Sequence, residues 1–455
     1  MKRLISSGWL TFWLALAVAG HAATVAAEPV TDPAAPSATK VQQFTLANGM
    51  QILVLEDHSI PNANMYLFWK VGSRNEAPGI TGISHFFEHM MFNGAKKYGP
   101  KMFDQVMEAS GGANNAYTTE NLTVYTNWFP QSALETIFDL EADRIADLAI
   151  DPAMVESERG VVISERSTGL ENSNYRTLNE ALKSVAFQAH PYSWSIIGHE
   201  SDIHAWTLDD LVQYHKTYYA PNNAVVVIAG AVTLAQVQQL AEQYFGPIPA
   251  QPAPRQVRTV EPEQKGQRRV FVQKTSATSP NIMLGYHVPA TSDPDYYALE
   301  LMSTILSNGK SSRLYQALVE QQLATNVFTN LPLSFDPNLF YVYAIARPGV
   351  AASTLEQAML QALSAVAKNG VTVQELEKAK NIQLMDFYRN MQTINGKANN
   401  IGTYQLYFGD YRKLYQTAEL FNKVTTADIQ RVAARYLTRA NRTVGVLDAT
   451  EEADE

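Results

Sequence analysis

Short apolar-rich runs separated by turn residues dominate the chain after residue 40. Residues 41–46 and 50–55 are two such runs, and Asn48-Gly49 between them is typical of a β-hairpin turn. Further strands are predicted at residues 64–71, 116–128 and 224–229. Predicted helices lie between them: one follows Gly82 and ends near residue 93, and others cover residues 101–109, 131–148, 153–170 and 207–219.

A proline-rich stretch divides this pattern. Residues 246–267 contain five prolines and no apolar periodicity, which is typical of a linker. With 455 residues, the chain is also too long for one hydrophobic core. We therefore predict two domains, residues 41–245 and residues 268–455, joined by this linker.

The two predicted domains share sequence patterns. Three pairs of residues recur at one constant offset: Asp210 with Asp428, Tyr218 with Tyr436, and Asn223 with Asn441. Such a long repeat indicates a duplicated domain and not a solenoid. The alternative is two unrelated α+β domains with common patterns.

The duplication has a chemical consequence. Asn93-Gly94, which ends a predicted helix, matches Asn308-Gly309 in the second domain. This alignment places His85, Glu88 and His89 opposite, in that order, Glu300, Ser303 and Thr304. The second copy would keep the helix and lose the imidazoles.

The first 27 residues have the features of a secretory signal peptide. Lys2 and Arg3 precede an apolar run of about 12 residues, too short to span a bilayer, and small residues follow at 25–27. Residues 28–40 form a predicted flexible lead-in. An exported chain without cysteine forms no disulfide, and a periplasmic location fits best. No membrane span is expected in the mature chain.

Composition and charge limit the classes of function that the chain can have. The chain is 46% hydrophobic and 17% charged, as in ordinary globular proteins. Its net charge of −9 argues against a nucleic-acid partner, which requires a surplus of Lys and Arg on some face.

The residue types with the strongest chemical meaning are in His85-Phe-Phe-Glu88-His89. On a helix, residues four apart share a face, so the two imidazoles lie at a spacing that zinc accepts. Glu88 would hold a water molecule beside the metal and take its proton as general base. The alternative is a histidine pair on a half-buried helix with Glu88 as a solvated neighbour.

A catalytic zinc needs a third protein ligand and one open position. Glu158 and Glu165 are seven residues apart, hence on one face of a predicted helix. One would bind the metal, and the other would accept a hydrogen bond from a ligand histidine. The spacing does not decide between them.

His85-Phe-Phe-Glu-His89 with Glu165 downstream resembles the inverted zinc motif of the pitrilysin/insulinase-type metallopeptidases, in particular their short, two-domain, processing-peptidase-like bacterial members. Other segments resemble landmarks of that family in the same order: residues 46–55, 111–118, 157–165, 190–192, 219–224 and 311–315.

The resemblance implies a fold and a site. The fold would be α+β, with two similar duplicated domains, each an antiparallel-rich sheet covered by helices. Residues 41–245 would form the catalytic, zinc-binding domain, and residues 268–455 a homologous domain that binds no metal. One Zn²⁺ per chain would be held by His85, His89 and Glu165, with Glu158 supporting a ligand. Substrate peptide would add as a strand at Asn115 and Ala116.

One departure from the family concerns an Arg and a Tyr, seven residues apart, that hold the substrate backbone. Leu318 and Thr325 stand at those positions here. The resemblance therefore implies a heterodimer, in which a homologous subunit supplies the Arg/Tyr pair and this chain supplies zinc.

Three functions are compatible with these patterns. The first is a zinc-dependent endopeptidase acting on peptides or unfolded segments. The second is a non-catalytic assembly or binding subunit, against which the intact His85, Glu88 and His89 argue. The third is metal storage, for which a single site with two His and one Glu is poorly suited.

Overall fold

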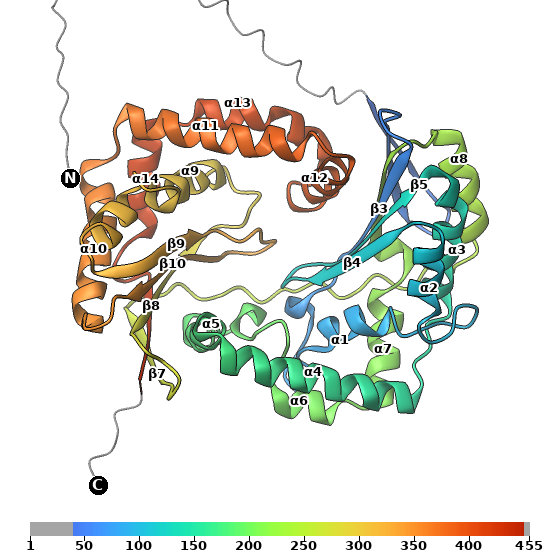
Figure 1. Ribbon diagram of the computed structural model, residues 1–455, viewed down its shortest axis with the longest axis horizontal. Coiled ribbons are helices and arrows are strands. Elements are labelled where there is room, and N and C mark those ends of the chain that lie inside the picture. Colours follow the sequence, from blue (N-terminus) through green and yellow to red (C-terminus); the bar gives the residue numbers. More distant parts are fainter. Residues whose placement is uncertain (1–39, 450–455) are drawn as a thin grey trace, which may run out of the picture. The chain divides into compact units, whose positions relative to one another are not determined.

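The computed structural model describes residues 40–449 (Figure 1). The predicted signal peptide and the lead-in up to residue 39 lie outside this part of the chain, as do residues 450–455. Among residues 40–449, no helix combines the length and the apolar character needed to cross a bilayer.

The first sheet has the strand order β1-β2-β6-β3-β5-β4. Its strands are β1 (Val41–Thr45), β2 (Gln51–Glu56), β3 (Asn62–Trp69), β4 (Ala113–Thr118), β5 (Thr123–Pro130) and β6 (Ala224–Gly230). All neighbouring pairs are antiparallel except β2 with β6. Gly49 has φ +88° in the turn between β1 and β2, a conformation that glycine adopts without strain.

The second sheet repeats this arrangement in the order β7-β11-β8-β10-β9. Its strands are β7 (Arg268–Gln273), β8 (Asn281–Val288), β9 (Ala324–Asn330), β10 (Asn338–Ala346) and β11 (Arg442–Asp448). Again one pair is parallel, β7 with β11, and the others are antiparallel. Without β1, the two sheets have the same topology, so the predicted α+β fold of two similar domains is confirmed.

The repeated residues also make the same contacts. Thr207 and Asp210 form a capping box at α7 (Leu208–Tyr218), and Thr425 and Asp428 form one at α14 (Thr426–Tyr436). The Nδ2 of Asn223 donates to the carbonyl oxygen of Tyr218 at 2.8 Å, and Asn441 donates to Tyr436 at the same distance.

One predicted strand is wrong. Residues 116–128 are not one strand but parts of β4 and β5, which form a hairpin. The turn contains neither glycine nor proline. Its backbone is held by Thr119, whose Oγ1 accepts hydrogen bonds from the N–H groups of Asn121 and Leu122.

All helices of the first domain except one cover one face of its sheet. The helices are α1 (Ile83–Met90), α2 (Met102–Ala109), α3 (Leu134–Ala146), α4 (Pro152–Asn172), α5 (Asn174–Ala186), α6 (Glu200–Ala205), α7 (Leu208–Tyr218) and α8 (Leu234–Leu240). All except α5 contribute buried apolar side chains to one cluster with the sheet. This cluster includes Phe86 and Phe87 of α1.

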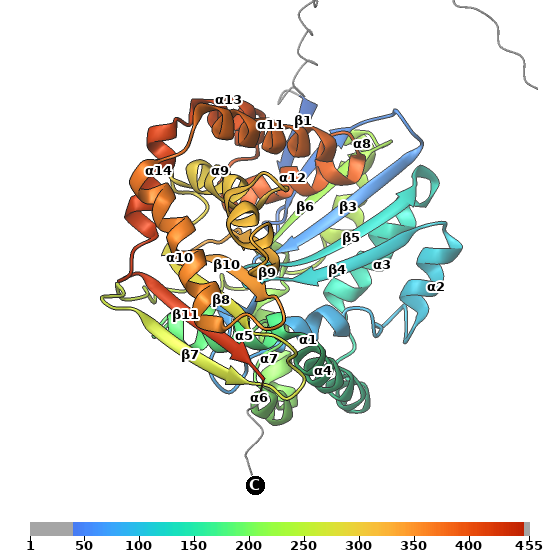
Figure 2. The same cartoon turned by 60° about the vertical axis from the view of Figure 1, so that its left-hand side comes forward.

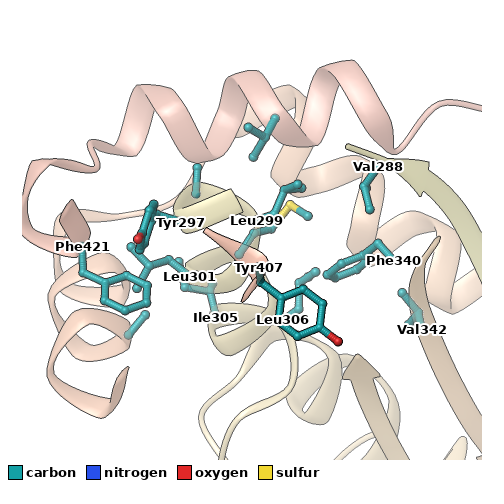
Figure 3. Packing of buried hydrophobic residues seen from close by; sticks show 14 of the residues in the cluster. Val288, Tyr297, Leu299, Leu301, Ile305, Leu306, Phe340, Val342, Tyr407 and Phe421 are labelled. Atoms are coloured by element: carbon teal, nitrogen blue, oxygen red, sulfur yellow. The ribbon is translucent and has the colours of Figure 1, made fainter. Parts of the chain in front are cut away.

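The second domain has the helices α9 (Tyr296–Ser307), α10 (Ala352–Asn369), α11 (Val373–Asn390), α12 (Ile394–Tyr407), α13 (Thr417–Lys423) and α14 (Thr426–Tyr436). Figure 3 shows the packing of α9, whose Leu299, Leu301, Ile305 and Leu306 lie among Phe340 of β10, Tyr407 of α12 and Phe421 of α13. This helix corresponds to α1 of the first domain.

The two domains exchange one helix each. Leu178 and Leu182 of α5 pack on the second sheet against Met283 and Leu339. In return, α12 packs on the first sheet, and the Oδ1 of its Asn395 accepts hydrogen bonds from Asn64 and Tyr66 of β3 (Figure 1). Residues 246–267 contain no regular helix or strand.

Candidate metal centre

The helix that contains the His-x-x-Glu-His sequence begins at a buried cap. Gly82 has φ +87° there, and a Cβ at this position would lie 2.3 Å from the carbonyl oxygen of Ile197. The carboxylate of Glu76 accepts hydrogen bonds from the N–H groups of Gly82 and Ser84, at 2.8 Å each. Burial raises the pKa of Glu76 to about 8. These contacts fix the direction of α1.

The two faces of α1 have different surroundings. Phe86 and Phe87 are fully buried beneath the helix. His85, Glu88 and His89 are partly exposed. The ring centres of the two histidines are 4.7 Å apart. One helical turn therefore presents two imidazoles together, as the spacing predicts.

The carboxylates come from α4, which begins at Asp151. The side chain of Asp151 accepts hydrogen bonds from the N–H groups of Ala153 and Met154, and Pro152 occupies the first helical position. Arg159 anchors the helix from below, because its guanidinium donates to the carbonyl oxygens of Ile203 and Trp206. Glu158 and Glu165 consequently face α1.

The geometry distinguishes the two glutamates. The Oε2 of Glu165 lies 3.7 Å from the Nε2 of His85 and 3.5 Å from the Nε2 of His89. The Oε1 of Glu158 instead lies 2.7 Å from the Nδ1 of His89, and its Oε2 accepts a 2.7 Å hydrogen bond from Asn93. Glu158 thus contacts the side of the His89 ring that faces away from Glu165.

The donor set fits a divalent metal ion. Ligand atoms of His85, His89 and Glu165 all lie within 4.8 Å of one another. Two donors about 2.1 Å from a tetrahedral zinc ion are separated by about 3.4 Å, close to the separations observed here. Two imidazoles and one carboxylate also match the ligand types of catalytic zinc sites that keep a fourth position open.

The electrostatics of the two histidines differ. Burial, helped by the nearby charge of His89, lowers the pKa of His85 to about 4. Burial also opposes a charge on His89, but the hydrogen bonds that its ring donates to the carboxylates of Glu158 and Glu165 outweigh it and raise the pKa of His89 to about 9. Carboxylates that favour a proton at this ring equally favour a divalent cation beside it.

The carboxylate of Glu88 lies between the sheet and the candidate ligands, and it lines one cavity together with His89. Its Oε2 accepts a hydrogen bond from the hydroxyl group of Thr118 in β4. Burial raises the pKa of Glu88, and the Thr118 hydrogen bond partly opposes this shift. The carboxylate is therefore beside the candidate metal centre and held by Thr118.

The strand that contains Thr118 is an edge strand. β4 pairs only with β5 and ends the strand order of the first sheet, and Figure 2 shows it at the free edge above α1 and α4. A cavity of about 300 Å³ is lined by Asn115 and Ala116 together with Glu88 and His89. The two predicted substrate-binding residues thus lie beside the candidate metal centre.

The second domain has no imidazoles at the positions that correspond to His85 and His89. His85 and His89 correspond to Glu300 and Thr304 of α9. The Nε2 of Gln383 in α11 donates to Thr304 at 2.7 Å and to Glu300 at 3.3 Å. Gln383 follows Glu165 by 218 residues, the same offset as the repeated pairs. Hydrogen bonds connect these three residues where the first domain has its candidate metal ligands.

Leu318 and Thr325 stand where the family has the Arg/Tyr pair, and they make contacts typical of a core residue and a strand residue. Leu318 is completely buried in the hydrophobic core of the second domain. Thr325 lies in β9, and its hydroxyl group donates to the carbonyl oxygen of Ile345. Neither side chain is a substitute for a guanidinium or a phenol.

Sequence reasoning missed Thr118, the role of Asn93, and Glu76. For Thr118 a signal was available, because it lies two residues after Ala116 and therefore on the same face of the strand. Asn93 lies four residues after His89, just beyond the end of α1, a spacing that also suits a shared partner. Nothing in the spacing of Glu76 indicated that it caps α1.

The fold and this cluster are those of a class of two-domain proteins that includes zinc metallopeptidases. Residues 51–200 match the family described as Insulinase (Peptidase family M16), and residues 205–383 match the Peptidase M16 inactive domain. The chain belongs to peptidase family M16.

Similar proteins are zinc proteases and processing peptidases by name. Zinc protease PqqE of Helicobacter pylori is 32% identical over 87% of this chain and 90% of its own. The crystal structure of a protease from Helicobacter pylori has a TM-score of 0.87, with 30% identity, over 90% of this chain and 99% of that one. A probable mitochondrial-processing peptidase subunit beta of Arabidopsis thaliana is 26% identical over 88% of this chain and 77% of its own.

Proposed function

We propose that this chain is a zinc-dependent endopeptidase, with one zinc ion held by His85, His89 and Glu165 and with Glu88 as general base. The observation that carries the proposal is the separation of Glu165 from the two imidazoles, 3.7 and 3.5 Å. The names of the similar proteins and the family match agree with it.

Each residue has a distinct task in this proposal. Zinc held by the three ligands supplies Lewis-acid chemistry, acidifying water and polarising a peptide carbonyl group. Glu88 takes the proton from the attacking water and passes it to the leaving amine, for which a pKa raised by burial is suited. Thr118 orients the Glu88 carboxylate, and Glu158 fixes the tautomer of His89 so that its Nε2 is free for the metal.

Substrate binding would use the free edge of β4. An extended peptide that adds to this edge forms main-chain hydrogen bonds with residues such as Asn115 and Ala116, whatever its side chains are. The edge lies beside Glu88 and His89, so the added strand would pass the zinc ion. This mode of binding suits peptides and unfolded segments, because folded proteins rarely offer a free strand.

Two further parts of the proposal concern partner and location. Leu318 and Thr325 lack the chemistry of the Arg/Tyr pair, so a homologous subunit would supply it in a heterodimer. The similarity to a processing peptidase named as a subunit agrees with this. Residues 1–27 would direct the chain to the periplasm as a signal peptide, with the catalytic domain at residues 41–245 and the second domain after residue 267.

Peptide cleavage tests the proposed function. The mature protein, with and without its homologous subunit, is incubated with an unstructured peptide and the products are identified by mass spectrometry. We expect internal cleavage that stops on zinc chelation and returns on addition of one equivalent of zinc. Cleavage that persists in the zinc-free protein would contradict the proposal.

A further inference from the structure

A second cavity, of about 270 Å³, lies on the other side of the candidate ligands and is lined by both His85 and Glu165. Thr118 of β4 is also part of its wall, so the cavity begins where an added substrate strand would pass the metal. Its remaining walls come from α4, α5 and residues 195–197. A side chain next to the cleaved bond can therefore enter it.

Apart from the candidate ligands His85 and Glu165, the charged side chains that line this cavity are Arg166, Arg176 and Glu180. Arg166 and Glu180 form an ion pair with two hydrogen bonds, at 3.0 and 2.7 Å, and neutralise each other. Arg176 also lines the cavity; its positive charge acts on the carboxylate of Glu165, but its guanidinium forms no ion pair within residues 40–449. Apart from the candidate ligands, Arg176 is thus the one charged side chain of the cavity without an ion-pair partner among residues 40–449.

The guanidinium of Arg176 occupies space that is free because residue 169 is a glycine. Gly169 follows Glu165 by one helical turn, and a Cβ there would lie 2.6 Å from the Nη1 of Arg176. The guanidinium therefore rests directly against α4, near the carboxylate of Glu165. Glycine inside a helix costs stability, and close approach of another group is one reason to have it.

Two more polar groups in the cavity wall are unsatisfied. The Oδ1 of Asn179 and the Oγ of Ser195 are buried and have no hydrogen-bond partner among residues 40–449. Buried polar atoms normally have partners, so their presence in one cavity indicates a ligand. The hydroxyl group of Ser195 is a donor, and the Asn179 amide offers its NH₂ after rotation.

We propose that this cavity is a substrate subsite that binds a carboxylate, with Arg176 as the specificity-determining residue and Ser195 and Asn179 as additional donors. This inference rests on the proposed peptidase function and names its substrate class: peptides with an acidic group next to the cleaved bond. The carboxylate is that of a Glu or Asp side chain, or that of a C-terminal residue.

Matched peptides test the subsite. Each fluorescent test peptide has Glu, Gln or Lys at one position next to the cleaved bond, and both flanking positions are tested in turn. Two further peptides end at the tested position, one with a free and one with an amidated C-terminus. Affinity is measured by anisotropy with the zinc-loaded protein, and cleavage is followed in the same samples. The protein should bind the Glu peptide about tenfold more tightly than the Lys peptide, the worth of one charge-assisted hydrogen bond.

Charge reversal provides the decisive comparison. Arg176→Glu should reverse the preference in favour of the Lys peptide, and Arg176→Ala should remove it. Lys310→Glu makes the same change in net charge at an exposed residue after α9 and should leave the preference unaltered. A preference for the amidated over the free terminus, with Glu bound tightly, would assign the side chain as the source of the carboxylate.

Failure of the subsite differs from failure of the peptidase function. Equal affinities for the Glu and Lys peptides, or no binding of the Glu peptide up to millimolar concentration, overturn the subsite. If all peptides are nevertheless cleaved, the peptidase function stands. If Arg176→Glu reverses the affinities but no peptide is cleaved with or without the homologous subunit, the subsite stands and the peptidase function fails.

Discussion

Glu88→Gln should lower kcat/KM for peptide cleavage by about 10³-fold or more, which is within the contribution of general acid–base catalysis. Glutamine has the same shape and can still accept the hydrogen bond from Thr118, but it cannot take a proton. Because Glu88 does not belong to the cluster of candidate ligands, the zinc content should stay at one per chain. The two measurements are initial rates of peptide cleavage and metal analysis of the same sample.

A suitable control is Glu108→Gln. Glu108 lies on α2, is exposed, and forms no ion pair with the residues of the described chain. This variant has the same change of charge and should retain full activity. If Glu88→Gln kept more than about a tenth of the activity, or lost its zinc, the assignment of the general base would be wrong.

The homologous subunit should raise kcat/KM of this chain by about 10² to 10³-fold, the effect of a single hydrogen-bond donor that stabilises the transition state. This chain has no Arg/Tyr pair at Leu318 and Thr325, and Leu318 is buried among apolar side chains. Cleavage rates are measured as the subunit is titrated into a constant amount of this chain. Saturation at one subunit per chain is expected.

The outcome depends on the subunit's own Arg and Tyr. A subunit in which both are replaced by Ala should still form the complex, which sedimentation can verify, and should not raise the rate. Full activity of this chain alone, unchanged by any amount of subunit, would contradict the two-subunit arrangement.

Much of the candidate site could be predicted because it depends on helix geometry. His85 and His89 lie one turn apart on α1, and Glu158 and Glu165 lie two turns apart on α4. Which glutamate faces the metal depends on how α4 is placed against α1. The local sequence does not contain this information, and only the family resemblance assigned Glu165.

The missing elements have the same physical origin. The prediction omitted α5, whose sequence is polar apart from a few positions, because its apolar residues pack on the other domain. Leu178 fits above Gly445, where a Cβ would lie 2.9 Å from the Cδ1 of the leucine. The hairpin of β4 and β5 was missed because a threonine side chain, not glycine, holds its turn.

Arg176 could not be identified from a sequence motif. It is eleven residues beyond Glu165, on another helix, and no spacing rule connects the two. Only the turn between α4 and α5 and the absence of a side chain at Gly169 bring its guanidinium next to the candidate metal centre. The proposed subsite could therefore be found only from the three-dimensional arrangement.

Location of the bound metal is the most direct test of the account. Diffraction data from crystals of the zinc-loaded protein, collected on both sides of the zinc absorption edge, reveal zinc by its anomalous signal. One peak per chain is expected, within bonding distance of the Nε2 atoms of His85 and His89 and of the Glu165 carboxylate. Zinc bound elsewhere, or imidazoles turned away from Glu165 in an active protein, would contradict it.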